Sequence, residues 1–102
     1  MTELRFEWDN AKNVANRRKH GIGFEEASRV FLDPFMVSVK ERIEGGEQRW
    51  QTFGKVEGIL LLMVSHTVRE ETSLAGTIEV MRIISARRAT RKERQRYEEE
   101  NG

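Results

Sequence analysis

Positions 59–67 carry the sequence ILLLMVSHT, in which hydrophobic side chains occupy odd and even positions alike. Successive side chains of a β-strand point to opposite faces of a sheet, so this segment predicts a strand that is apolar on both faces. Such a strand belongs in the centre of a sheet, covered by helices on one face and at least in part on the other. The apolar run is far shorter than the ~20 residues that span a membrane.

Other segments of the chain also alternate with a period of two. They are residues 35–40, 49–53 and 79–85. Glycines lie between the four predicted strands, at positions 45 and 46, at 54 and 58, and at 76. Because short glycine-containing links favour antiparallel neighbours, we expect a mainly antiparallel sheet.

Two helices are predicted before these strands. Residues 4–8 predict a short first strand, after which Asp9 is a good N-cap for a helix that ends at Gly21. Residues 24–31 repeat aromatic and small side chains at helical spacing. Pro34 and the residue before it end this second helix, since the residue before a proline avoids the helical conformation.

The last helix is predicted by Thr90 and Glu93, a T-x-x-E capping box that begins a helix running towards Glu100. Residues 85–89 are then the junction between strand and helix. Together the elements predict an α+β fold, with two N-terminal helices packed on a four-stranded, mainly antiparallel sheet, an additional short N-terminal strand and a C-terminal helix. The length of 102 residues fits a single domain, 1–102.

The composition excludes several kinds of chemistry. The chain has no cysteine, which removes disulfides, thiolate catalysis and the usual zinc frameworks, and its two histidines are far apart. We therefore expect no metal and no cofactor. The N-terminal MTELRFEWD has acidic residues where a signal peptide requires basic and apolar ones, so we expect a cytoplasmic protein without membrane attachment.

Charge is distributed unevenly along the chain. The 18 Lys and Arg residues nearly balance the 17 Asp and Glu residues, but positions 87–97 hold six basic side chains and a single acidic one. Such a cluster is either a solvated helix surface or a binding site for an anion. Arg91, Lys92, Arg94 and Arg96 fit the solvated surface, whereas Arg87 and Arg88 precede the predicted helix.

Two further arginines lie on or beside predicted strands. Alternation along the last strand places Met81, Ile83 and Ser85 on one face and Val80, Arg82 and Ile84 on the other. Arg82 is therefore either at the rim of the core, with its head in water, or on a sheet face that binds a ligand. Arg69 directly follows the central strand and is similarly placed at a sheet end.

Four motifs, taken together, are specific for one protein family. They are FEWDNAKNVANRRKHGIGFEEASRVFLDP at 6–34, GEQRWQTFG at 46–54, Thr67-Val68-Arg69, and MRIISARRATRKERQRY at 81–97. They resemble motifs of the BrnT-type toxins: F-E-W-D-x-x-K-N-x-x-N-x-x-K-H-G, an E-x-R-aromatic strand, T-H-R, and R-I-I-S-A-R followed by E-R-x-x-Y. Each motif alone is a weak signal, but their common order spans essentially the whole chain.

This resemblance implies a RelE-like fold, a ribonuclease that stops translation, and a partner antitoxin of the BrnA type. It also implies that promoter DNA is bound only by toxin and antitoxin together. One departure from the family concerns the segment between Arg69 and Arg82, which is longer than the tight hairpin of many relatives.

RNA can be cleaved without a metal when the 2′-hydroxyl attacks the adjacent phosphorus. The reaction needs a base, a proton donor and cations that stabilise the charge on the phosphorane. Arginine serves only the last role, because its pKa above ~12 keeps it charged. We expect Arg69 and Arg87, followed by Arg49, to form this clamp, and Lys19, Arg82 and Arg88 to contact RNA.

Proton transfer then falls to His20, Glu47 or Tyr97, and each has a structural alternative. His20 ends a helix and is equally suited to satisfy its last carbonyls. Glu47 alternatively pairs with an arginine on its own face, and the ring of Tyr97 alternatively packs on the sheet. His66, on the same side of its strand as Leu62, is expected to be a partly buried histidine with its hydrogen bonds satisfied.

The sequence therefore leads to two functional hypotheses of different classes. The first is a metal-independent endoribonuclease toxin. The second is a non-catalytic subunit whose basic surface docks an acidic antitoxin segment or supports operator binding. They differ in the role of the arginines.

Overall fold

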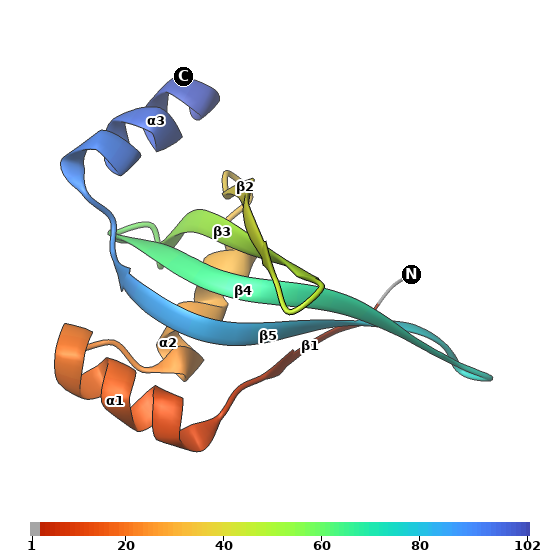
Figure 1. Ribbon diagram of the computed structural model, residues 1–102. Helices are drawn as coiled ribbons and strands as arrows, with labels where there is room; N and C mark the ends of the chain where they lie inside the picture. Colours follow the sequence, from red (N-terminus) through yellow and green to blue (C-terminus); the bar gives the residue numbers. More distant parts are fainter. Residues whose placement is uncertain (1–2) are drawn as a thin grey trace.

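The computed structural model describes residues 3–102, which form one five-stranded mixed sheet with helices on both faces (Figure 1). The strand order is β1-β5-β4-β3-β2. In chain order the elements are β1 Glu3–Glu7, α1 Asn10–His20, α2 Phe24–Ser28, the 3-10 helix η1 Arg29–Leu32, β2 Val37–Glu44, β3 Glu47–Val56, β4 Leu60–Ser73, β5 Gly76–Arg88 and α3 Arg91–Asn101. No helix of residues 3–102 is long and apolar enough to cross a membrane.

The predicted α+β class is confirmed, but the layout differs in one respect. The short N-terminal strand is not a separate addition to a four-stranded sheet, because β1 is the fifth strand of the same sheet and runs parallel to β5. It satisfies the outer backbone groups of β5 between Ile78 and Arg82, which would otherwise form an open edge. The apolar segment at 59–67 lies almost entirely in β4, the central strand, as predicted.

Both N-terminal helices form where the sequence predicts them. The side chain of Asp9 caps α1 by accepting a hydrogen bond from the Lys12 N–H (3.1 Å), and Gly21 ends it in a left-handed conformation with φ of 72°. The second predicted helix is divided, because only Phe24–Ser28 is α-helical and the chain then tightens into η1. Asp33, before the proline, is extended, which ends η1.

Two buried asparagines dock α1 on the sheet. Asn16 accepts a hydrogen bond from the Ala86 N–H (3.1 Å) and donates to the Ala86 carbonyl (2.8 Å). Since β1 pairs with β5 only as far as Arg82, Asn16 takes the place of a strand on the next part of that edge. Asn13 accepts a hydrogen bond from the Phe24 N–H (2.8 Å) and so orients α2. Both asparagines stand in the K-N-x-x-N part of the first family motif, but no role was predicted for them from the sequence.

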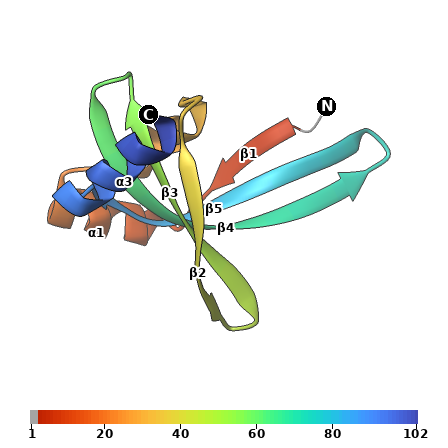
Figure 2. The same ribbon diagram turned by 90° about the horizontal axis from the view of Figure 1, so that it is seen from above.

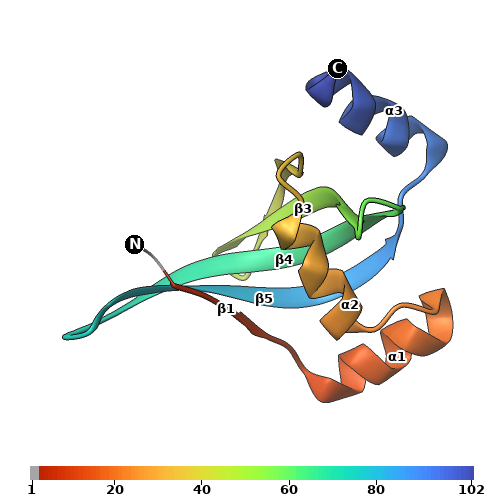
Figure 3. The ribbon, with the colours of Figure 1, turned by 180° about the vertical axis from the view of Figure 1, so that it is seen from behind.

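The two faces of the sheet are covered differently. Side chains of α2 and η1 pack on Leu62, Val64 and Ile83, and we call this side the helix face. The opposite side, which we call the open face, is covered only at one end, where Tyr97 of α3 packs on Leu61 and its neighbours. Figures 1 and 3 show α3 and the pair α1–α2 on opposite sides of the sheet.

The strands are longer than the sequence predicts. β4 and β5 extend past the rest of the sheet as a two-stranded hairpin (Figure 2), which absorbs the long segment between Arg69 and Arg82. Gly54, expected in a turn, lies within β3, where a Cβ atom would come within 2.7 Å of Val30 on η1. Arg87 and Arg88, expected in a junction, are the last two residues of β5.

A β-bulge changes which side chains of β5 share a face. His66 pairs with Ile83 but Ser65 pairs with Ser85, so one extra residue of β5 lies between these pairs. The predicted grouping of Ser85 with Ile83 was therefore wrong. After the bulge it is Ala86 that joins the core of the helix face, and Ser85 and Arg87 lie on the open face.

Candidate functional site

The register of the sheet places four of the five arginines that the sequence predicts at the site on the open face. In β4 the core residues of the helix face are even-numbered. Successive side chains of a strand point to opposite faces, so the odd-numbered Arg69 points to the open face. In β5, Arg82 pairs with Thr67 and Arg87 with Met63, both of which are open-face positions. Arg49 precedes Trp50, whose partner His66 belongs to the helix face, so Arg49 also lies on the open face.

Glu7 of β1 connects two of these arginines. Its carboxylate is hydrogen-bonded to both ends of the Arg69 guanidinium, and Oε1 also accepts from Arg82 (3.4 Å). Glu71 binds Arg69 from the other side (3.1 Å). The hydrogen bond from Arg69 is the main reason that the pKa of Glu7 lies below its usual value, and the same bond raises the pKa of Arg69.

Arg87 is held by a second carboxylate, at the start of α3. Its two terminal nitrogens donate to Glu93 at 2.7 and 3.0 Å. Glu93 also completes the predicted capping box, since it accepts from the Thr90 N–H (2.8 Å) while Thr90 accepts from the Glu93 N–H (3.2 Å). The hydrogen bond between the side chains lowers the pKa of Glu93 and raises that of Arg87. One contact therefore orients Arg87 and anchors α3.

The third carboxylate on this surface belongs to β2. Glu44 binds Arg49 at 3.0 Å and Arg42 at 3.4 Å. Glu47, which the sequence predicts as a possible partner of Arg49, is exposed beside the turn between β2 and β3, where its backbone pairs with that of Glu44. Between the arginines the open face is polar, and Thr67 and Ser65 are buried there under their neighbours.

The remaining RNA-binding and proton-transfer candidates lie outside this cluster. Lys19 and His20 are in the last turn of α1, on the other side of the sheet from α3 (Figure 3). Lys19 is exposed and His20 is half-buried. Arg88 is exposed and pairs with Leu62, a helix-face position. Their proposed roles stay predictions, and the structure does not bring them together with the open-face arginines.

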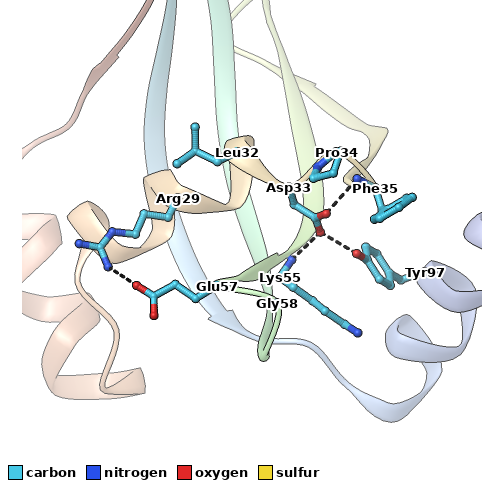
Figure 4. Close-up of a pocket in the computed structure, with 9 residues that line it drawn as sticks. All are labelled: Arg29, Leu32, Asp33, Pro34, Phe35, Lys55, Glu57, Gly58 and Tyr97. Atoms are coloured by element: carbon cyan, nitrogen blue, oxygen red, sulfur yellow. Dashed lines mark hydrogen bonds and ion pairs between the residues drawn. The ribbon is translucent and has the colours of Figure 1, made fainter.

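Tyr97 lies at a different place, beside a cavity of about 600 Å³ between η1, the β3–β4 turn and α3 (Figure 4). Its hydroxyl donates to Asp33 Oδ2 at 2.6 Å. The backbone N–H groups of Lys55 and Phe35 donate to the same carboxylate, each at 2.8 Å. Among the described residues, none of the four open-face arginines lines this cavity.

This environment suits Tyr97 to a structural role. Burial and the hydrogen bond to Asp33 raise the pKa of Tyr97 to about 12. Burial of Asp33 opposes its ionisation, but the hydrogen bonds from Tyr97 and two backbone N–H groups hold the pKa of Asp33 below its usual value. A phenol with a raised pKa, already bonded to a carboxylate, is a poor proton donor for a distant leaving group.

We predict that Tyr97→Phe lowers the free energy of unfolding by about 1–2 kcal/mol, because it removes one hydrogen bond to a charged group. The rate of RNA cleavage should stay within a few-fold of the parent. Urea denaturation and a cleavage assay on the folded variant measure the two effects. A loss of rate on the order of 10²-fold in a folded Tyr97→Phe protein would instead assign Tyr97 a chemical role.

His66 lies on the helix face, as predicted, and is buried more fully than expected. It is 2% exposed, its Nε2 lies 2.7 Å from Thr52 Oγ1, and its ring packs edge-on against Phe31. Thr52 is in turn bonded to Ser38 (2.7 Å), so a polar chain crosses three strands beneath the core. His66 is therefore part of the protein interior and does not face the arginines.

Glu7 is the residue of this site that sequence reasoning missed. The motif F-E-W-D contains it, but its role depends on the parallel pairing of β1 with β5, which sets Glu7 opposite Arg82. No local pattern specifies the register of a strand that pairs with a segment 75 positions away.

Comparison with known proteins gives a consistent result. One family, described as the ribonuclease toxin BrnT of type II toxin–antitoxin systems, matches residues 8–93. No curated protein matches the chain. A crystal structure of the ribonuclease toxin BrnT from Brucella abortus matches with a TM-score of 0.56 and 22% sequence identity, covering 88% of this chain and all of that one. At this identity the structural match concerns the fold.

The family match covers α1, the strands β2 to β5 and the start of α3, so it includes the strands that carry the four open-face arginines. It therefore extends over most of the chain, includes two of the four motifs in full and overlaps most of the other two. The chain belongs to the BrnT family, the ribonuclease toxins of type II toxin–antitoxin systems.

Proposed function

We propose that this protein is a metal-independent endoribonuclease that binds RNA on the open face of its sheet and inhibits translation. The observation that carries the proposal is the register that gathers Arg49, Arg69, Arg82 and Arg87 on one face from three adjacent strands. Three carboxylates hold these guanidiniums in fixed orientations. Preorganised cations are what a phosphorane transition state requires.

In this mechanism the 2′-hydroxyl attacks the neighbouring phosphorus, and the 5′-oxygen leaves with a proton. Arg69 and Arg87 stabilise the negative charge on the phosphorane, with Arg49 beside them. Arg82 binds the RNA backbone on the open face, and Lys19 and Arg88 contact RNA that extends beyond this face. Glu47 is the candidate for proton transfer that lies nearest to these arginines, in the strand of Arg49. His20 ends α1 on the other side of the sheet and Tyr97 is bonded to Asp33, so both are weaker candidates.

Two features of the chain support chemistry without a metal. It has no cysteine, and of its two histidines His66 is buried and bonded to Thr52. The usual ligand sets for zinc are therefore not available. We propose that the arginines supply the positive charge that a metal supplies in other nucleases.

The family implies an antitoxin partner, and we propose that it is of the BrnA type. Covering the open face would silence the enzyme by excluding RNA from the arginines. Promoter DNA is bound, in this proposal, only by the complex of toxin and antitoxin.

A cleavage assay in chelator tests the proposed reaction. Labelled RNA incubated with the purified protein in EDTA should be cut and should carry 2′,3′-cyclic phosphate at the new ends. Addition of the antitoxin should slow the same reaction. Strict dependence on added Mg²⁺ or Mn²⁺, or a complex that cleaves at the rate of the free protein, contradicts the proposal.

The pairing of Arg49, Arg69, Arg82 and Arg87 with glutamates also suits the second candidate function. In a non-catalytic subunit these arginines would exchange their carboxylates for those of an acidic antitoxin segment. That protein would bind the antitoxin and leave RNA intact in every buffer, so the same assay separates the two.

A further inference from the structure

The carboxylate of Glu7 lies between two guanidiniums that come from different strands. Arg69 is on β4 and Arg82 on β5, and Glu7 reaches both from β1. Arg69 Nη2 lies 3.2 Å from Oε2, and Arg82 Nη1 lies 3.4 Å from Oε1. The backbone fixes this arrangement, because Glu7 pairs with Arg82 in the register of β1 and β5.

The environment of this carboxylate is that of a bound anion. The fork of Arg69 and one N–H of Arg82 converge on a planar group with two charged oxygens, and arginines bind the two free oxygens of a phosphodiester in a similar way. The site is open to solvent, since the side chains of Arg69 and Arg82 are 44% and 43% exposed and that of Glu7 is 33% exposed. An incoming phosphate can therefore reach both guanidiniums without any change in the core.

We infer that Arg69 and Arg82 form a subsite for one phosphodiester group of RNA, and that Glu7 occupies this subsite in the free protein and leaves it when RNA binds. The inference rests on the proposed function for the identity of the polyanion. Glu7 is then a built-in competitor of the substrate. Arg69 keeps its orientation after Glu7 has left, because Glu71 still binds it at 3.1 Å.

Competition by Glu7 has a measurable signature in the salt dependence of binding. For single-stranded nucleic acid, the slope of log K against log salt changes by about 0.7 for each phosphate that the protein neutralises. In the parent, the charge of Glu7 cancels part of the charge that Arg69 and Arg82 offer to RNA. Glu7→Gln removes that charge and keeps the shape, so we expect affinity to rise about 3- to 10-fold at low salt and the slope to steepen by about 0.7.

The probe is a fluorescent RNA with 2′-O-methyl groups, which cannot undergo attack by the 2′-hydroxyl. Anisotropy titrations over a series of NaCl concentrations give both affinity and slope. The matched control is Glu57→Gln, which removes the same charge from an exposed pair with Arg29 (3.2 Å) at the cavity beside Tyr97. Glu57→Gln should leave the slope unchanged, and Glu71→Gln, which frees only one side of Arg69, should give a smaller change than Glu7→Gln.

The results separate the alternatives. Weaker binding by Glu7→Gln, or a slope equal to that of Glu57→Gln, overturns the inference and leaves Glu7 as a residue that only positions the arginines. If Glu7→Gln fails to fold by circular dichroism, Arg82→Gln tests the subsite instead. That variant should lose affinity and flatten the slope by about 0.7, whereas Arg29→Gln should do neither, and equal behaviour of the two overturns the subsite.

The design also distinguishes failure of the inference from failure of the proposed function. Binding is measured on RNA that cannot be cut, so a protein that shows the steeper slope but never cleaves natural RNA has the subsite without the ribonuclease activity. A protein that cleaves natural RNA but binds the probe equally well with Gln at position 7 has the activity without this subsite.

Discussion

Replacement of Arg69 or Arg87 by alanine is expected to lower the rate of RNA cleavage on the order of 10²-fold or more. Both guanidiniums lie on the open face and are held in place by carboxylates, Arg69 by Glu7 and Arg87 by Glu93. Cations fixed in this way stabilise charge that develops only in the transition state, so their loss affects turnover more than RNA affinity. Single-turnover cleavage rates and binding to uncut RNA measure the two quantities separately.

Two kinds of control make this result specific. Arg91, Lys92 and Arg94 are exposed on α3, so alanine there should weaken RNA binding in a salt-dependent way without a comparable loss of turnover. Arg87→Lys keeps the charge but loses the fork that matches Glu93, and it should fall between the parent and Arg87→Ala.

Stability must be followed in the same experiment. Arg87→Ala also breaks the contact between β5 and α3, which we expect to cost about 1–2 kcal/mol of unfolding free energy. Rates are therefore compared well below the midpoint of thermal unfolding. If Arg69→Ala and Arg87→Ala are folded and still cleave RNA like the parent, the clamp assignment is wrong and these arginines belong to the antitoxin interface or to neither function.

Acidification from pH 7 to pH 4 should destabilise the protein by on the order of 3 kcal/mol through His66 alone. Burial lowers the pKa of His66 to about 4, against 6.5 for an unperturbed histidine. The unfolded chain therefore takes up a proton as the pH falls through 6.5, while the folded protein resists it until about pH 4. The stabilisation is fully present above pH 6.5 and is lost as the pH falls through this window.

Urea denaturation at several pH values between 7 and 4 measures this loss. The pKa values of Glu7, Asp33 and Glu93 are also lowered by their partners, but carboxyls of this kind lose their stabilising charge at lower pH than a histidine does. His66→Gln should be less stable than the parent at pH 7 and should lose less on acidification. If the free energy of unfolding falls equally steeply with pH for the parent and for His66→Gln between pH 6.5 and pH 4.5, His66 is not the cause of the loss of stability.

Local features of the sequence predicted local structure well. The caps at Asp9, Gly21 and Thr90 all formed, because each depends on a few neighbouring residues. The apolar character of β4 determined its central place, since only a strand covered on both faces can bury the side chains at odd and at even positions alike. Strand ends were less well predicted, because the long β4–β5 hairpin continues through residues in which hydrophobic and polar side chains do not alternate regularly.

The sequence by itself also identified the family and selected the four arginines that the sheet gathers on one face. What only the tertiary structure decided is how they meet. A β-bulge shifted Ser85 and Arg87 to the open face, and the parallel pairing of β1 placed Glu7 between Arg69 and Arg82. The physical reason is that register between distant strands depends on packing and backbone hydrogen bonds summed over the whole sheet, whereas period and capping depend only on residues close in sequence.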